Sequence, residues 1–222
     1  PHPDAAPVTL RPRPAGVAPA GLNGVGGLTP DPEEATPTDA GTAVASGGGG
    51  DGQSDGSGTE TLVDNVSFAG DVLAAAEWTD HRLLYATPEL ARPVHISGTA
   101  EVTVRLAASE PAVNLSVWLV SLPWQGRGPT TDDVITRGWA DPQNRASLRE
   151  SEPLVPGRFY DVTFTLQPDD QVIPAGERIG LMIFSSDRDF TLWPRPGAEL
   201  TVDLGGTSVT LPVVEGVEAL RQ

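Results

Sequence analysis

Short alternations of apolar and polar residues dominate the chain from residue 61 onward. Val102, Val104 and Leu106 are separated by Thr103 and Arg105, and the same period of two returns in residues 160–166 and 178–183. This period places successive side chains on opposite faces of a β-strand. The pattern predicts a series of short strands separated by turns, at the spacing that is typical of a sandwich or barrel.

Two strands can be assigned in more detail. Residues 113–122 are apolar at nearly every position, which indicates a central strand that is covered on both faces. In residues 178–183 the alternation predicts that Leu181 faces the core together with Ile179 and Ile183, while Gly180 and Met182 face the other way.

The last alternation is interrupted by Gly205 and Gly206. Apolar residues recur at every second position on both sides of the pair, at 200, 202 and 204 and at 209, 211 and 213. Two glycines accept the positive φ angles of a tight turn. We therefore expect a β-hairpin that turns at Gly205 and Gly206.

Helical periodicity is nearly absent. Residues 68–78, which contain an Ala-Ala-Ala run, favour one short helix that starts near Gly70 and Asp71. No long amphipathic helices alternate with the strands, so the chain lacks the α/β pattern that usually carries a serine-hydrolase nucleophile. The predicted fold class is all-β, a jelly-roll-like antiparallel β-sandwich.

The first 60 residues have a different composition. Residues 41–58 are almost entirely Gly, Ser, Asp and Ala, which bury too little apolar surface to offset the entropy of ordering them. Ahead of them, the alternation around Val8 and Leu10 predicts a short edge strand before Pro12 and Pro14. We interpret residues 1–60 as the tail of a preceding domain with a disordered Gly-rich linker, and residues 61–222 as the sandwich domain.

Composition excludes several classes of partner and chemistry. The net charge of -16 opposes binding to nucleic acid, because phosphate contacts need clustered Lys and Arg. No apolar run is long enough for a membrane span, and the absence of Cys excludes disulfides and thiolate metal sites. We expect no cofactor and no metal. The compartment stays open between cytoplasmic and secreted, with secretion slightly favoured.

The candidate catalytic groups do not form a set. Residues 52–56 match G-x-S-x-G, but a Gly-rich tract does not supply the strained strand-to-helix turn that a nucleophile needs, so we interpret the match as accidental. His2, His81 and His95 have no metal-site spacing and no nucleophile to complete a triad. We therefore predict no catalytic residue in this chain.

The five Trp residues raise the possibility of a binding surface. Trp118 lies inside an apolar strand and is expected in the core, whereas Trp124, Trp139 and Trp193 fall near predicted loops or strand ends. Together with Arg188, these three define a candidate interface or ligand rim, for which packing is favoured over stacking on sugar rings. The run Asp187-Arg188-Asp189 is interpreted as a polar turn.

Eight blocks of sequence follow one another along the domain: LLYATPEL (83–90), ISGTAEV (96–102), GW (138–139), RASLR (145–149), EPLVPG (152–157), YDVTFTL (160–166), VIPAGERI (172–179) and SS (185–186). In this order they resemble one known family, the C-terminal non-catalytic domain of Xaa-Pro dipeptidyl-peptidases and cocaine-esterase-type acyl hydrolases.

The resemblance implies a galactose-binding-like jelly roll that follows an α/β-hydrolase domain, and it places the Ser-Asp-His triad in that domain. The partner would then be the catalytic domain of the same polypeptide. The module would pack on that domain and form one side of the active-site cleft, or it would enlarge the surface of a homo-oligomer. The parent enzyme would release N-terminal X-Pro dipeptides or cleave an ester. Two alternatives stay open, an independent carbohydrate-binding sandwich and a purely structural oligomerisation domain.

Overall fold

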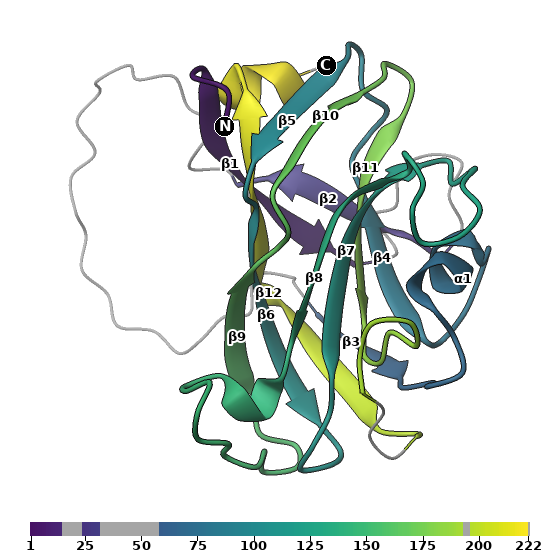
Figure 1. The fold of residues 1–222 in the computed structure, drawn as a ribbon, viewed down its shortest axis with the longest axis vertical. Coiled ribbons are helices and arrows are strands. Elements are labelled where there is room, and N and C mark those ends of the chain that lie inside the picture. Colours follow the sequence, from purple (N-terminus) through teal and green to yellow (C-terminus); the bar gives the residue numbers. More distant parts are fainter. Residues whose placement is uncertain (15–23, 32–57, 193–195, 222) are drawn as a thin grey trace.

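The computed structural model describes residues 1–14, 24–31, 58–192 and 196–221 (Figure 1). Within these residues the chain forms twelve strands, one short α-helix and two 3₁₀ helices. Their bounds are β1 (Ala5–Arg13), β2 (Gly26–Pro30), β3 (Thr59–Val63), α1 (Gly70–Ala75), β4 (Arg82–Ala86), β5 (Val94–Gly98), β6 (Glu101–Ala108), β7 (Leu115–Leu122), β8 (Val134–Ala140), η2 (Pro142–Asn144), β9 (Tyr160–Thr165), β10 (Asp169–Ile173), β11 (Arg178–Phe184), β12 (Glu199–Val214) and η3 (Gly216–Leu220).

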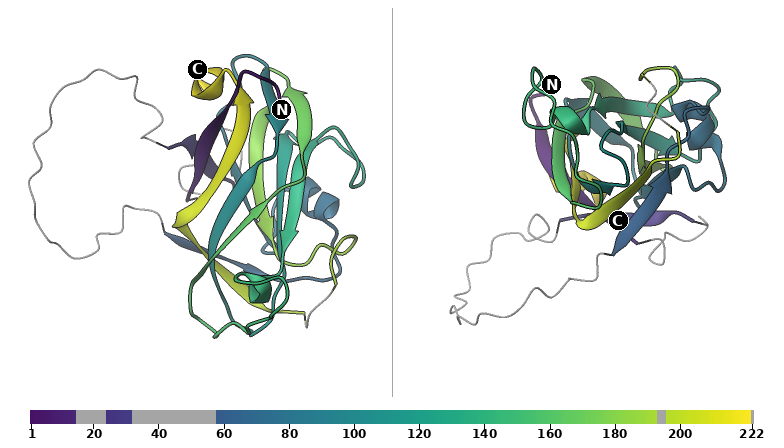
Figure 2. Two further views of the ribbon diagram at one scale, coloured as in Figure 1. Left: turned by 60° about the vertical axis from the view of Figure 1, so that its left-hand side comes forward. Right: turned by 90° about the horizontal axis from the view of Figure 1, so that it is seen from below.

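The strands form one continuous sheet that folds over on itself. The path runs β10-β5-β12-β1-β2-β4-β11-β7-β8, while β3 and β6 pair with β12, and β9 pairs with β6. Every pairing is antiparallel except that of β2 with β4. Seen from below, the strands surround a common interior (Figure 2). The prediction of an all-β sandwich is confirmed.

Strand β8 closes the fold against the segment between β9 and β10. The Gln167 amide donates to the Arg137 carbonyl at 2.8 Å, and the Thr136 hydroxyl donates to the Gln167 carbonyl at 2.5 Å. At Gly138 a Cβ atom would approach Leu166 Cδ2 to 2.8 Å, so a larger residue would push the two segments apart. Glycine at this position allows the close approach.

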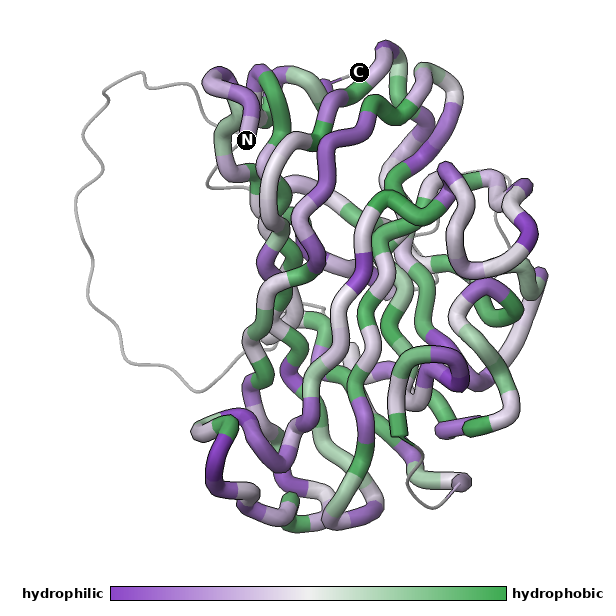
Figure 3. The backbone as a smooth tube through the Cα atoms, viewed as in Figure 1, coloured by the Kyte–Doolittle hydropathy of each residue, from purple (hydrophilic) through white to green (hydrophobic). Residues whose placement is uncertain are grey.

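The interior is mainly aliphatic, with Tyr85 as its one fully buried aromatic residue among those described. Ile179, Leu181 and Ile183 point into it, as predicted, and are fully buried. They meet residues from the opposite layer, such as Val202 and Leu211 of β12. Figure 3 shows the hydrophobic positions of the central strands in green.

Gly180 and Met182 face the other way, as predicted, but this second face is also buried. Trp118, Met182 and Phe184 are fully buried in it, and α1, which contributes Leu73 and Ala74, lies beside β4 (Figure 1). The helix lies within the predicted residues 68–78, and it begins at a glycine because a Cβ atom on Gly70 would lie 2.3 Å from the Trp118 ring. We call this second group the outer cluster. Its buried members are Val25, Leu73, Ala74, Leu84, Ala86, Trp118, Val120, Leu122, Met182 and Phe184.

The predicted hairpin at Gly205 and Gly206 is wrong. Residues on both sides of the pair belong to the single strand β12 and continue along the same partner, β6, with a bulge between Asp203 and Ser208. Neither glycine has a positive φ. A Cβ atom on Gly206 would instead lie 2.2 Å from Arg105 Cδ. This glycine therefore makes room for a side chain.

The strand predicted around Val8 and Leu10 exists as β1, but it is not an edge strand. It pairs with β12 on one side and with β2 on the other. The two prolines are accommodated, with Pro12 still aligned with Leu28. Residues 41–57 of the predicted linker, which include the G-x-S-x-G match, lie outside the described residues. The division of the chain at residue 60 stays a prediction.

Candidate functional site

The outer face of β8, β7, β11 and β4 carries aromatic and charged side chains in adjacent rows. Cross-strand register aligns Arg137, Trp118, Met182 and Leu84 in one row, and Trp139, Ser116, Phe184 and Arg82 in the next. Facing residues in antiparallel strands project to the same side of a sheet. Aromatic and charged groups therefore gather on one face that the other layer does not cover.

Asp187 organises one end of this face. Its carboxylate follows β11 and is fully buried. Oδ2 accepts hydrogen bonds from Trp118 Nε1 at 3.1 Å and from Trp139 Nε1 at 3.0 Å, while Oδ1 accepts from the Gly70 amide at 3.3 Å. One carboxylate thus ties together β7, β8 and the start of α1.

Burial raises the pKa of Asp187, although the hydrogen bonds from Trp139, Gly70 and Trp118 lower it. Burial prevails because removing a carboxylate from water disfavours its charged form. The loop after Asp187 is ordered by the same residue, whose carbonyl accepts from the Phe190 amide at 3.0 Å and from the Thr191 amide at 2.8 Å. The position of Phe190 therefore depends on the main-chain carbonyl of residue 187, whereas that of Trp139 depends on the Asp187 side chain.

Phe190 and Trp139 form a partly exposed stack. Their ring centroids are 4.9 Å apart at 28°, and Phe190 is 42% exposed. The Arg137 guanidinium lies 4.2 Å from the Phe190 centroid and 5.1 Å from the Trp118 centroid. Burial lowers the pKa of Arg137, which Asp187 partly offsets. We call Arg137, Trp139 and Phe190 the aromatic rim.

The structure separates the residues of the predicted rim. Trp139 lies in the aromatic rim, and Arg188 follows Asp187 with its Nη1 donating to the Ser67 carbonyl at 3.2 Å. Trp124 packs instead on the far end of the outer cluster, and Trp193 lies outside the described residues. Trp118 is fully buried, as predicted. The role of these residues as an interface or ligand rim stays a prediction.

Sequence reasoning missed Asp187 and Arg137, whereas Phe190 lies within residues 188–193, which the sequence predicts as rim positions. The sequence predicts a polar turn at Asp187, because nothing local distinguishes a buried aspartate from a solvated one. A weak signal existed on β8, where Arg137 and Trp139 are two residues apart and therefore share a face. Their convergence on Asp187 depends on three separate segments.

The histidines lie at the opposite end of the sandwich or beside β3. His95 Nε2 is 2.5 Å from Asp170 Oδ1, and hydrogen bonds from His95 and Ser97 lower the pKa of Asp170. Because the carboxylate lies between these two residues, the order differs from a Ser-His-Asp relay, in which the His is central. His81 Nδ1 lies 2.9 Å from the Val63 carbonyl oxygen.

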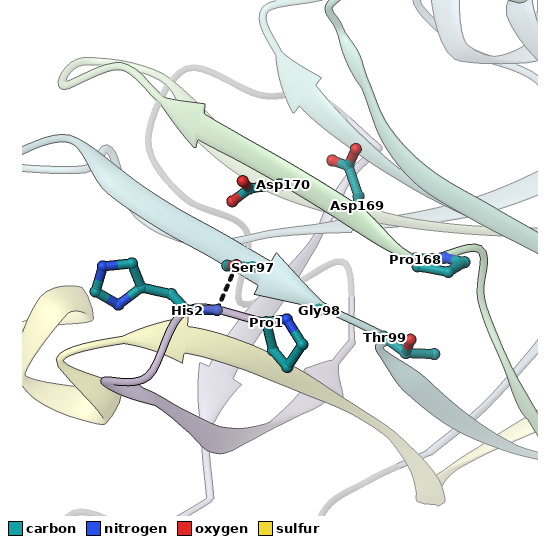
Figure 4. Close-up of a pocket in the computed structure, with 8 residues that line it drawn as sticks. All are labelled: Pro1, His2, Ser97, Gly98, Thr99, Pro168, Asp169 and Asp170. Carbon is teal, nitrogen blue, oxygen red and sulfur yellow. Dashed lines mark hydrogen bonds between the residues drawn. The ribbon is translucent and has the colours of Figure 1, made fainter.

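A hollow of about 730 Å³ lies at this end of the molecule (Figure 4). In it the His2 amide donates to the Ser97 hydroxyl at 2.8 Å. Burial raises the pKa of Asp169, whose Oδ2 is enclosed without a partner. The lining residues are Pro1, His2, Ser97, Gly98, Thr99, Pro168, Asp169 and Asp170. Among the described residues no group of three or more His, Asp and Glu is placed to hold a metal ion, and no helix is long and apolar enough to cross a membrane.

Fold and site together define an all-β sandwich module with a fixed aromatic rim on its outer face. The family model for the X-Pro dipeptidyl-peptidase C-terminal non-catalytic domain matches residues 26–219. The chain belongs to this family, and the resemblance noted in the sequence is confirmed.

Relatives with similar sequences are much longer than this chain. A protein of Rhodopirellula baltica, provisionally named an Xaa-Pro dipeptidyl-peptidase, is 66% identical over 165 residues, which are 73% of this chain and 26% of the relative. One from Bacillus anthracis with the same provisional name is 38% identical over 157 residues, which are 70% of this chain and 25% of the relative. The chain thus spans about a quarter of the length of these relatives.

Solved structures with the same fold are also larger. An α-amino acid ester hydrolase matches with a TM-score of 0.59 and 16% identity, over 94% of this chain and 36% of that one. A CocE/NonD family hydrolase from Staphylococcus aureus matches with a TM-score of 0.60 and 11% identity, over 96% of this chain and 37% of that one. At these identities the matches establish the fold alone.

Proposed function

We propose that the chain is the accessory module of a larger serine hydrolase that releases X-Pro dipeptides or cleaves a related ester. In this proposal the module packs on the α/β-hydrolase catalytic domain through its aromatic rim and helps to shape the active-site cleft. The observation that carries the proposal is the partly exposed Trp139–Phe190 stack, held in place by a buried carboxylate.

The rim has the chemistry of an interface anchor. Trp, Tyr and Arg contribute most of the binding energy at protein interfaces, and rigid side chains lose little entropy on binding. Trp139 is fixed by its hydrogen bond to Asp187, and Phe190 is fixed by the loop that the same residue orders. Leu192, two residues further along, is 91% exposed and extends the apolar surface. A protein surface that covers the aromatic rim would bury Trp139, Phe190 and Leu192.

The family match supports an accessory role. The matching model describes a non-catalytic domain, and relatives devote about three quarters of their length to other sequence. An all-β wall beside a cleft excludes water and long substrates without supplying a reacting group. The galactose-binding-like assignment and homo-oligomerisation remain part of this proposal.

A carbohydrate-binding function is the second candidate. A hollow of about 290 Å³ is lined by Trp139 together with the polar residues Asp141, Asn144 and Arg145. A sugar would need a free ring face and free polar groups. Trp139 already stacks on Phe190, and Arg145 bonds Glu152 at 2.7 Å. These contacts favour the interface over the sugar site.

The test uses the polypeptide in which this chain follows its hydrolase domain. Phe190→Ala should lower turnover of an Ala-Pro p-nitroanilide substrate and separate the two domains in limited proteolysis. The matched control is Phe159→Ala, because Phe159 also lies under an arginine, with Arg105 5.6 Å from its centroid. Equal behaviour of the two variants would contradict the proposal, and polysaccharide binding lost only in Trp139→Ala would favour the second candidate.

A further inference from the structure

Arg82 is a buried cation without a buried partner of opposite charge. It opens β4 and is only 7% exposed. Its Nε donates to the Leu73 carbonyl at 2.6 Å, and its Nη2 donates to the Ala76 carbonyl at 2.5 Å. No carboxylate within the described parts of the chain forms an ion pair with it.

The guanidinium has hydrogen-bonding capacity left over. It carries five N–H groups, of which two donate to Leu73 and Ala76, so three have no acceptor among the described residues. Burial lowers the pKa of Arg82 to about 10, and no neighbouring acid opposes this effect. The group still carries its charge at neutral pH. A buried charge of this kind is stabilised strongly by an anion that reaches it.

A hollow of about 230 Å³ borders Arg82 between α1 and the end of β7. Apart from Arg82, its walls are apolar except for Glu77, which is exposed. We call it the arginine pocket. It is lined by Val25, Ala74, Ala75, Ala76, Glu77, Arg82, Leu84, Leu122, Pro123 and Trp124.

We propose that the arginine pocket binds a carboxylate carried on a small apolar body. A guanidinium presents paired N–H donors that match the two oxygens of a carboxylate. Trp124, Leu84 and Leu122 offer apolar and aromatic contacts to the rest of the ligand. The volume of about 230 Å³ fits a small acid or the end of an acidic side chain. The carboxylate comes either from a free organic acid or from an acidic side chain of a longer polypeptide, and the experiment separates these sources.

The first measurement is a titration of the full chain with benzoate, followed by Trp fluorescence and by the amide and Arg Nε–H signals in NMR. Benzoate should bind saturably with a Kd on the order of 1 mM. Uncharged benzamide should bind at least about tenfold more weakly, because it cannot form charge-assisted hydrogen bonds with Arg82. Arg82→Gln should raise the Kd for benzoate by about tenfold or more. Arg149→Gln makes the same charge change at an exposed site and should leave this Kd unchanged. Glu77→Gln should lower the Kd for benzoate, because it removes a negative charge from the wall of the arginine pocket.

A second variant protects the test against a folding defect, because Arg82→Gln also removes two bonds to backbone carbonyls. Ala75→Phe, at an exposed helix position that lines the pocket, should fill the hollow and abolish benzoate binding while Arg82 and its bonds remain. The proposal is overturned if benzoate shows no saturation up to about 50 mM, or if folded Arg82→Gln and Ala75→Phe bind it as the wild type does.

The source is then identified with the longer polypeptide that includes the hydrolase domain. If benzoate no longer binds there and Arg82 Nε–H keeps the shift of the bound form, an acidic side chain of that polypeptide occupies the pocket. If benzoate binds equally well, the ligand is a free acid. Either result agrees with the proposal, which does not depend on the function proposed for the aromatic rim.

Discussion

The two faces of β4, β11, β7 and β8 are built differently. The inner face carries Leu181, Val117 and Leu119, which pack in the apolar core, and its Tyr85 hydroxyl donates to Glu60 Oε2 of β3 at 2.8 Å. The outer face combines Trp118 and the aromatic rim with three charged groups, those of Arg82, Arg137 and Asp187. The chain thus closes the inner face by itself, whereas the outer face retains unused hydrogen-bonding groups and a partly exposed aromatic stack. We infer that the inner face serves folding and the outer face serves binding.

The largest expected effect is on the inner face. Leu181→Ala should lower the free energy of unfolding by about 2–5 kcal/mol, because it leaves a cavity among close-packed neighbours. Denaturant melts measure the loss. Leu192→Ala removes the same atoms at a site that is 91% exposed and should cost less than about 0.5 kcal/mol. Similar losses in the two variants would show that the inner face is not closed as described.

A smaller loss is expected at the buried carboxylate of the outer face. Asp187→Ala leaves the Trp118 and Trp139 indole N–H groups without their acceptor and should cost about 1–3 kcal/mol. Asp189→Ala is the control, because this neighbour is exposed. Near-UV circular dichroism should report the loss of fixed Trp environments in Asp187→Ala only. An unchanged spectrum would mean that the carboxylate does not hold the rim.

The pH dependence of stability should also depend on Asp187. Burial raises the pKa of Asp187 above the ordinary 3.8 of an aspartate. Between the unfolded and the folded pKa, the folded chain therefore binds a proton that the unfolded chain has released. The wild type should therefore lose stability relative to Asp187→Asn as the pH rises from the unfolded pKa through the folded pKa. Thermal melts of both proteins across the acid range test the sign. A difference that grows in the opposite direction would mean that the hydrogen bonds outweigh burial.

The smallest effect on the isolated chain is expected at the exposed rim. Phe190→Ala should change the free energy of unfolding by only about 0.5–1 kcal/mol, since the lost contacts are a stack on Trp139, an edge-to-face contact with Trp118 and a cation–π contact, all on a partly exposed ring. Chemical melts of the isolated chain measure this value. A loss as large as that of Leu181→Ala would place Phe190 in the core and remove the contrast between the two faces.

Some of the outer face was accessible from the sequence. The Trp count and the positions of Trp124 and Trp139 near strand ends indicated aromatic residues outside the core. Arg82 and Asp187 gave no signal, because a charged residue in a strand or turn is usually solvated. Their burial results from packing against α1 and β8, which the local sequence does not encode.

Sequence alone determined the fold class, the inward face of β11 and the family, because strand periodicity and ordered blocks of residues are local properties. Only the tertiary structure decided that β12 runs on through Gly205 and Gly206, since a glycine pair allows a tight turn and close packing equally, and pairing with β6 selects between them. It also decided that β1 has partners on both sides and that Asp187 joins three segments. Burial and partners depend on what lies across the sheet, and alternation along a strand fixes only which side a residue faces.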